Sequence, residues 1–191
     1  IDEVTEQWGS LAIQGPRSHA ILSQLAPEVS GLGFFDHTPA KLGGAPVWIS
    51  GAGVTCEQGY EVFCDVPDAP AVWDTIFERA ADLDPKPFGL EPQRILRLEK
   101  GHVIVSQDTD SESNLHEAAM PWLVKNDKEF EWVGKWATQQ VADRGLKWML
   151  VGFESPSGAI PVEGGQVVVD GKSSGRVTSV RRSAELGKVI G

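Results

Sequence analysis

The sequence predicts an α+β fold with a small β module at its carboxyl end. Strand and helix signals follow one another in the order strand–helix, strand–strand–helix, helix. This order lacks regular βαβ alternation and favours mixed or antiparallel sheets flanked by helices. After residues 144–145 the pattern changes to short apolar runs separated by turn residues. We therefore predict one domain over residues 1–143 and a small β-barrel module over 144–191.

The first part of the chain contains three predicted strands and two predicted helices. Residues 11–13 form an apolar run that predicts a buried strand, and Pro16 suits the first position of a helix. Residues 47–49 predict a second strand, and the alternation over 60–66 predicts a half-buried third one. Asp68 is expected to cap the next helix. The apolar face of that helix is expected to comprise Val72, Trp73, Ile76, Phe77 and Ala80.

The rest of the chain contains two more helix signals and three strand signals. A helix is predicted to begin near Pro92 and to end at Gly101, and a shorter one spans 134–141. Asp170-Gly171 is a strong hairpin signal. The strands of the β module are expected at 148–151, 166–169 and 176–178.

The composition argues against several classes of protein. An apolar fraction of 41% and seven Trp favour a packed core over disorder. A net charge of −10 argues against a nucleic-acid partner. The apolar runs are too short to span a bilayer, so no membrane association is expected. Cys56 and Cys64 form no zinc or redox motif, which favours free thiols and a cytoplasmic location.

Two residues stand out as candidates for a binding site. Glu57 follows a glycine-rich stretch and precedes a strand, where a carboxylate can project into a cleft and accept two N–H donors from one heterocycle. An exposed loop Glu is the simpler alternative. Arg97 lies between two Leu on a predicted helix and is therefore expected to be buried with a carboxylate partner. Asp108 or Asp110 could supply that partner.

The acidic stretch 108–112 and the histidines predict no metal site. Alternating acids suggest a calcium loop, but the glycine and the distal Glu of an EF-hand are missing, which favours a solvated turn. The four His are scattered singly and show no ligand spacing. From the residues alone, the sequence supports a domain with a Glu- and Arg-lined cleft and no metal.

Five motifs, in order and spacing, resemble the folate-dependent aminomethyltransferase family, which includes the T-protein of the glycine cleavage system. The resemblance covers nearly the whole chain. The matching segments are L-A-x-Q-G-P at 11–16, the glycine- and glutamate-containing loop at 55–61, R-L-E-x-G at 97–101, D-x-D-x-E-x-x-x-x-E-A-x-x-x-W at 108–122 and G-x-V-T-S-x-x-x-S-x-x-L at 175–186.

The resemblance implies a function. Members of the family bind tetrahydrofolate and move a one-carbon unit to it from a small amine donor, with no metal. Glu57 matches the pterin-binding carboxylate, and Arg97 and Tyr60 are the other implied folate-binding residues. The catalytic aspartate of the family lies upstream of L-A-x-Q-G-P, so no catalytic residue is assigned. The chain is accordingly expected to be a C-terminal portion of such a protein, and to be inactive when isolated.

Several positions depart from the family pattern. Val54 and Cys56 replace a Tyr and a Gly of the loop, and Gln93 and Arg94 replace the Arg and Asp of an A-R-D step. The E-K-G ending at Gly101 resembles the folate modules of sarcosine oxidase α-subunits and dimethylglycine oxidases, which implies a flavin-containing domain or subunit as partner. The loss at Gln93 leaves open an alternative, a folate-fold binding or scaffold module without transfer activity.

Overall fold

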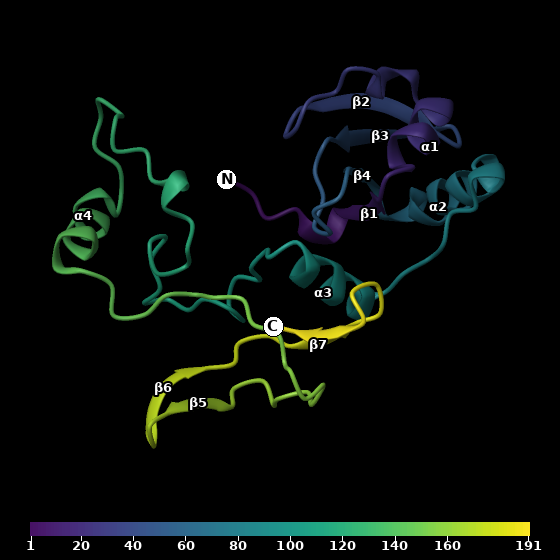
Figure 1. The fold of residues 1–191 in the computed structure, drawn as a ribbon. Coiled ribbons are helices and arrows are strands. Elements are labelled where there is room, and N and C mark those ends of the chain that lie inside the picture. The colour runs from purple at the N-terminus through teal and green to yellow at the C-terminus, as the bar shows by residue number, and fades with distance from the viewer. The chain divides into compact units, whose positions relative to one another are not determined.

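The computed structural model describes residues 1–191 and divides into two compact units (Figure 1). Unit 1 is Ile1–Lys100 and unit 2 is Gly101–Gly191. Helices and strands occur in both, so the predicted α+β class is confirmed. The domain boundary predicted near residue 143 stays a prediction. None of the helices combines the length and the apolar composition needed to cross a bilayer.

Unit 1 contains a four-stranded antiparallel sheet in the order β1-β4-β3-β2. Three strands agree with the predicted ones, whereas β2 was missed. Pro39 and Lys41 obscure its apolar pattern, and both residues suit the edge position that β2 occupies. The strands are β1 (Trp8–Gln14), β2 (His37–Leu42), β3 (Ala45–Ser50) and β4 (Gly59–Asp65).

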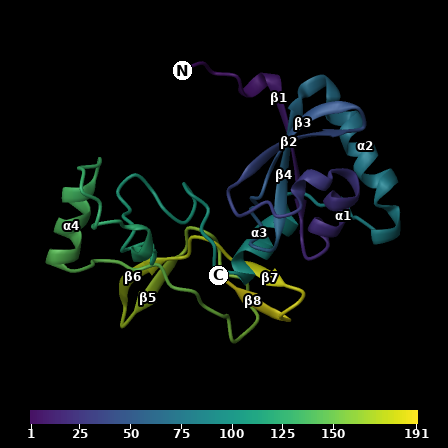
Figure 2. The same ribbon diagram turned by 90° about the horizontal axis from the view of Figure 1, so that it is seen from above.

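Three α-helices complete unit 1, and two of them cover one face of the sheet (Figure 2). Strand β4 shows why: its alternate side chains are fully buried, as expected for a strand with one face on a core. The helices are α1 (Ser18–Leu25), α2 (Ala69–Arg79) and α3 (Leu90–Glu99). Helices α1 and α2 supply the buried apolar residues that meet this face.

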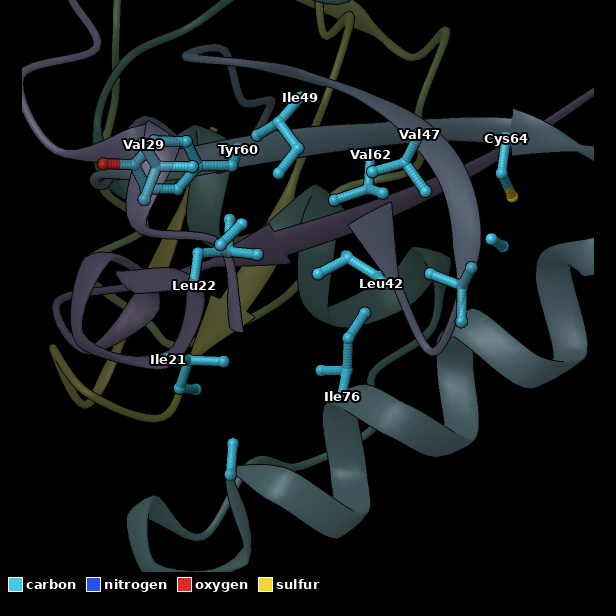
Figure 3. Packing of buried hydrophobic residues seen from close by; sticks show 14 residues of the cluster. Ile21, Leu22, Val29, Leu42, Val47, Ile49, Tyr60, Val62, Cys64 and Ile76 are labelled. Atoms are coloured by element: carbon cyan, nitrogen blue, oxygen red, sulfur yellow. The ribbon is translucent and has the colours of Figure 1, made fainter. Parts of the chain in front are cut away.

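The core of unit 1 is mainly aliphatic, with Tyr60 as the one aromatic residue of the cluster (Figure 3). Leu22 of α1, Ile49 of β3 and Val62 of β4 are completely buried. No Trp is among the buried side chains. Trp73, which was expected on the inner face of α2, is 42% exposed.

The start of α2 differs from the predicted one. Asp68 directly precedes the helix, but its backbone is helical and its side chain makes no capping hydrogen bond. Pro70 instead lies in the first turn, where the missing N–H would in any case have no helical partner. The predicted capping role of Asp68 is therefore wrong, although the helix begins where expected.

Unit 2 contains one α-helix and two separate two-stranded sheets. Its elements are α4 (Lys135–Arg144), β5 (Gln166–Val169), β6 (Lys172–Arg176), β7 (Arg181–Ser183) and β8 (Lys188–Ile190). The hairpin at Asp170-Gly171 is confirmed, with φ angles of 50° and 74°. The predicted small β-barrel is not confirmed, because the strands form no closed sheet. Residues 148–151, predicted as a strand, form none.

The core of unit 2 is small, and hydrogen bonds to the carboxylate of Asp108 lie beside it. Val177, Val180 and Val189 are buried and pack with Phe153. Beside them, one carboxylate oxygen of Asp108 accepts hydrogen bonds from the hydroxyls of Thr178 (2.7 Å) and Ser179 (2.5 Å). Asp108 therefore connects two distant segments of the sequence, which the predicted solvated turn did not anticipate.

A second acid of the same stretch is also engaged. Asp110 accepts hydrogen bonds from the amides of Glu112 and Ser113 and from the Ser113 hydroxyl. These bonds hold the pKa of Asp110 below its ordinary value, and the bond from the Ser113 side chain has the largest effect. Arg176 lies 3.2 Å from the same carboxylate. Residues 110–113 therefore form a hydrogen-bonded turn, and Asp110 also pairs with β6 through Arg176.

Five short 3-10 helices join these elements. They are η1 (Thr5–Gln7), η2 (Pro27–Val29), η3 (Val66–Asp68), η4 (Ala81–Leu83) and η5 (Pro121–Leu123). Three of them carry Pro in their first turn, which fixes φ and needs no amide partner there.

Candidate functional site

The candidate site of unit 1 is the loop that carries Glu57, between β3 and β4. The turn after β1 holds the end of this loop. The amide of Gly15 donates to the carbonyl of Gln58 over 2.8 Å, and the hydroxyl of Ser18 donates to the same oxygen over 3.0 Å. Ser18 is the first residue of α1 and is 1% exposed. The residue after Glu57 is thus fixed by two hydrogen bonds to the core of the unit.

Gln14, the last residue of β1, fixes the loop through hydrogen bonds of its side chain. Its side-chain oxygen accepts a hydrogen bond from Thr55 over 3.0 Å, and its amide nitrogen donates to the carbonyl of Tyr60 over 3.3 Å. A Cβ at Gly53 or Gly59 would lie 2.1 or 2.2 Å from the Gln14 oxygen. The glycines flanking Glu57 therefore leave the space that the Gln14 side chain occupies.

Cys56 gives the loop a strained backbone. Its φ is 65°, in the left-handed region that favours glycine. The family pattern has Gly at this position, and the observed conformation supplies the physical reason. The thiol is half-buried, and burial raises its pKa, although the charges of Lys100 and Arg97 act in the opposite direction.

Replacing Cys56 with Gly is therefore expected to stabilise unit 1. An L-residue in the left-handed region costs about 1–2 kcal/mol, while Gly loses roughly 0.5–1 kcal/mol more chain entropy on folding, so a net gain of about 0.5–1 kcal/mol is expected. Urea denaturation of the two proteins would measure it. Cys56→Ala is the matched control, because it removes the thiol and keeps the strain. Equal stability of the Gly and Ala variants would contradict this reading.

The carboxylate of Glu57 forms an ion pair with Lys100. The distance from Lys100 Nζ to Glu57 Oε1 is 2.6 Å, and the two side chains are 47% and 37% exposed. The hydrogen bond that Lys100 donates to Glu57, followed by the charge of Glu57, raises the pKa of Lys100. Lys100 directly follows α3, so the ion pair joins the end of this helix to the Glu57 loop.

The other two predicted folate-binding residues lie in different surroundings. Arg97 is buried on α3, as its apolar neighbours predicted, with 4% of its surface exposed. Tyr60 is 3% exposed and belongs to the hydrophobic core that Figure 3 shows. Its hydroxyl lies 2.7 Å from Nδ1 of His19. The structure thus brings Lys100 to Glu57, while Tyr60 packs in the hydrophobic core.

Two shallow surface depressions lie elsewhere. One is lined by Gln140, Asp143 and Arg144, and the other by residues 3–7. Glu57 lines neither of them. The chain also brings together no group of three or more His, Cys, Asp or Glu side chains that could hold a metal ion.

Sequence reasoning did not identify Gln14 and Thr55 as supports of the loop. A signal was present, because Gln14 belongs to the Q-G-P motif and the loop is bounded by glycines. The pairing of Lys100 with Glu57 had no sequence signal, since the two residues lie far apart and no periodicity links them.

The sequence of the chain is similar to a known protein family and to individual members of known function. The family described as "GCVT N-terminal domain" matches residues 1–128. The whole chain is 36% identical to an "Aminomethyltransferase" of Rubrobacter xylanophilus and 35% identical to one of Bacillus subtilis. It covers 50% and 53% of their lengths, so it spans about half of the curated relatives that it matches.

A solved structure matches the fold. The glycine cleavage system aminomethyltransferase T of Bartonella henselae superposes with a TM-score of 0.78 at 23% identity. The match covers 96% of this chain and 50% of that protein. The architecture described above is therefore that of a known structure.

Proposed function

The chain belongs to the GCVT N-terminal domain family, and from this premise we propose that it forms part of a tetrahydrofolate-dependent transferase. The reaction is transfer of a one-carbon unit, as an aminomethyl or methylene group, from a small amine donor to folate. The aminomethyltransferases among the relatives support this assignment.

One observation carries the proposal: Glu57 presents a partly exposed carboxylate on a loop that is held rigid. Gln14 and Ser18 fix this loop through Thr55 and Gln58, so the acid has a defined position. A carboxylate has two oxygens that accept parallel N–H donors, which suits the edge of a pterin ring. Preorganised acceptors bind more tightly than mobile ones, because less entropy is lost on binding.

Of the three predicted folate-binding residues, Glu57 is the one whose partly exposed side chain offers acceptors that suit a folate ligand. Glu57 would hold the pterin edge, and Arg97 and Tyr60 stay predicted folate-binding residues. Tetrahydrofolate, when bound, supplies the nitrogen that accepts the one-carbon unit. The task of this chain is then to hold and orient the ring, since no proton-transferring aspartate is assigned within it.

Replacing Glu57 with Gln is expected to weaken binding of 5-formyltetrahydrofolate to the full-length protein about 10- to 100-fold, since hydrogen bonds to a charged acceptor contribute about 1.5–3 kcal/mol. Isothermal titration calorimetry would measure the change. Glu61→Gln is the matched control, because Glu61 lies two positions beyond Gly59 on β4 and pairs with Ala12 of β1, away from the loop. Unchanged affinity of the Glu57 variant would remove the folate proposal.

A binding module without transfer activity is the second candidate, and Gln93 favours it. This residue occupies the position of the Arg in the family's A-R-D step and lies half-buried in α3. Folate binding without formation of methylenetetrahydrofolate by the full-length protein would select this candidate.

A more specific version of the first candidate is a folate module that works with a flavin-containing oxidase domain or subunit. It rests on the E-K-G ending that includes Lys100, which resembles folate modules attached to flavin domains. A flavin absorption spectrum in the purified full-length protein, or in its complex, would support that context. The relatives reported above are aminomethyltransferases, so a flavin partner is proposed on this motif alone.

A further inference from the structure

The ion pair between Lys100 and Glu57 affects what the carboxylate can bind. The ammonium lies 2.6 Å from Oε1, at the end of α3, and the carboxylate lies on the loop held by Gln14. Both partners are anchored through their backbones to ordered elements. The fold therefore places Lys100 beside the acid.

The ammonium leaves most of the acceptor capacity of Glu57 in place. A carboxylate offers about four lone-pair positions, and the single contact with Lys100 uses one of them. A ligand with a flat edge of neutral N–H donors can take the others without displacing the lysine. The negative charge of Glu57, in contrast, is already balanced.

A cationic ligand meets a different environment. Its positive charge would lie beside that of Lys100. The positive charge of Arg97 also reaches this loop, because it lowers the pKa of the Cys56 thiol as the charge of Lys100 does. Like charges at this range repel, and a repulsive group is an effective means of discrimination between similar ligands.

We propose that Lys100 is a specificity-determining residue, which makes the Glu57 site select ring edges with neutral N–H donors over protonated ones. The proposal rests on the proposed function and deepens it, because it names the ligand class as a neutral 4-oxo pterin edge. An unpaired carboxylate would make the opposite choice, since a protonated ring adds charge attraction to its hydrogen bonds.

Two ligands that differ at this edge provide the test. 5-Formyltetrahydrofolate has the neutral 4-oxo edge, whereas the 2,4-diaminopteridine ring of methotrexate takes up a proton when it binds a carboxylate. The ratio of their dissociation constants would be measured by calorimetry on the full-length protein. In Lys100→Met the preference for 5-formyltetrahydrofolate is expected to fall about threefold to fivefold, the range typical of a partly exposed charge pair.

Three further variants separate the possible outcomes. Lys100→Arg is expected to keep the preference, because it keeps the charge. Lys86→Met is the matched control, since it removes another exposed lysine ion pair of unit 1, that with Asp84, and is expected to change nothing. An unchanged ratio in Lys100→Met, with binding still sensitive to Glu57→Gln, would overturn this inference and leave the folate function intact. Binding insensitive to Glu57→Gln would remove the function itself, and this inference with it.

Discussion

Replacing Asp108 with Ala is expected to destabilise residues 101–191 by about 3–5 kcal/mol, the largest effect that the structure predicts for a polar residue. The carboxylate accepts hydrogen bonds from Ile104 N (2.8 Å), Thr178 and Ser179. Ser179 is 3% exposed, so its hydroxyl would lose a charged acceptor without gaining water. Leaving a buried donor without its acceptor costs about 1–3 kcal/mol, and several donors are affected here.

Amide hydrogen exchange would measure this loss in each unit separately. Protection is expected to fall in the segments around residues 104 and 177–180, because both depend on Asp108. Asp127→Ala, at an exposed position of the same unit, is expected to change protection by less than about 0.5 kcal/mol. Equal protection in the two variants would show that the hydrogen bonds to Asp108 are not needed for stability.

Leu22→Ala is expected to destabilise unit 1 by about 2–5 kcal/mol, the range for removing a buried Leu side chain and leaving a cavity. Leu22 is completely buried between α1 and the sheet, together with Val29 and Ile49 (Figure 3). A close-packed core relaxes only partly around the lost atoms. Helix α1 also carries Ser18, which holds Gln58, so the loss is expected to loosen the Glu57 loop as well.

Urea denaturation and hydrogen exchange over residues 1–100 would test this prediction. Leu90→Ala is the control, because Leu90 is 71% exposed at the start of α3 and is expected to change stability by less than about 0.5 kcal/mol. A loss below about 1 kcal/mol in Leu22→Ala would contradict the assigned core.

Local patterns predicted most of unit 1. The alternation over 60–66 identified β4, and the apolar spacing after Pro16 identified α1, because burial on one face imposes a period of 2 or 3.6 on the sequence. The same reasoning missed β2, where Pro39 and Lys41 interrupt the pattern at an edge. It also missed β7, since a strand of three residues is too short to show a period.

The predicted barrel is not confirmed and the Trp side chains are not buried, and both outcomes depend on long-range packing. Strand propensity indicates which segments extend, but closure of a sheet depends on pairing between segments far apart in the chain. Hydrophobicity indicates that Trp can be buried, whereas its burial depends on which face of each element meets the core. Trp73 shows this, because it lies on α2 beside the buried Val72 and is itself exposed.

The candidate site divides in the same way. Sequence motifs identified Glu57 and predicted that Arg97 is buried, because residue type and immediate neighbours carry that information. The supports of Glu57 come from elsewhere in the chain: Gln14 from β1, and Lys100 from the end of α3. No local pattern encodes these contacts, since they form only when the strands pair.

The sequence by itself thus determined the α+β class, most elements of unit 1 and the identity of the candidate acid. Each of these follows from local periodicity, turn chemistry or motif spacing. The tertiary structure alone decided that Asp108 joins Thr178 and Ser179, and that Lys100 faces Glu57. Such pairings depend on distances between residues remote in sequence, which chain packing sets and composition does not.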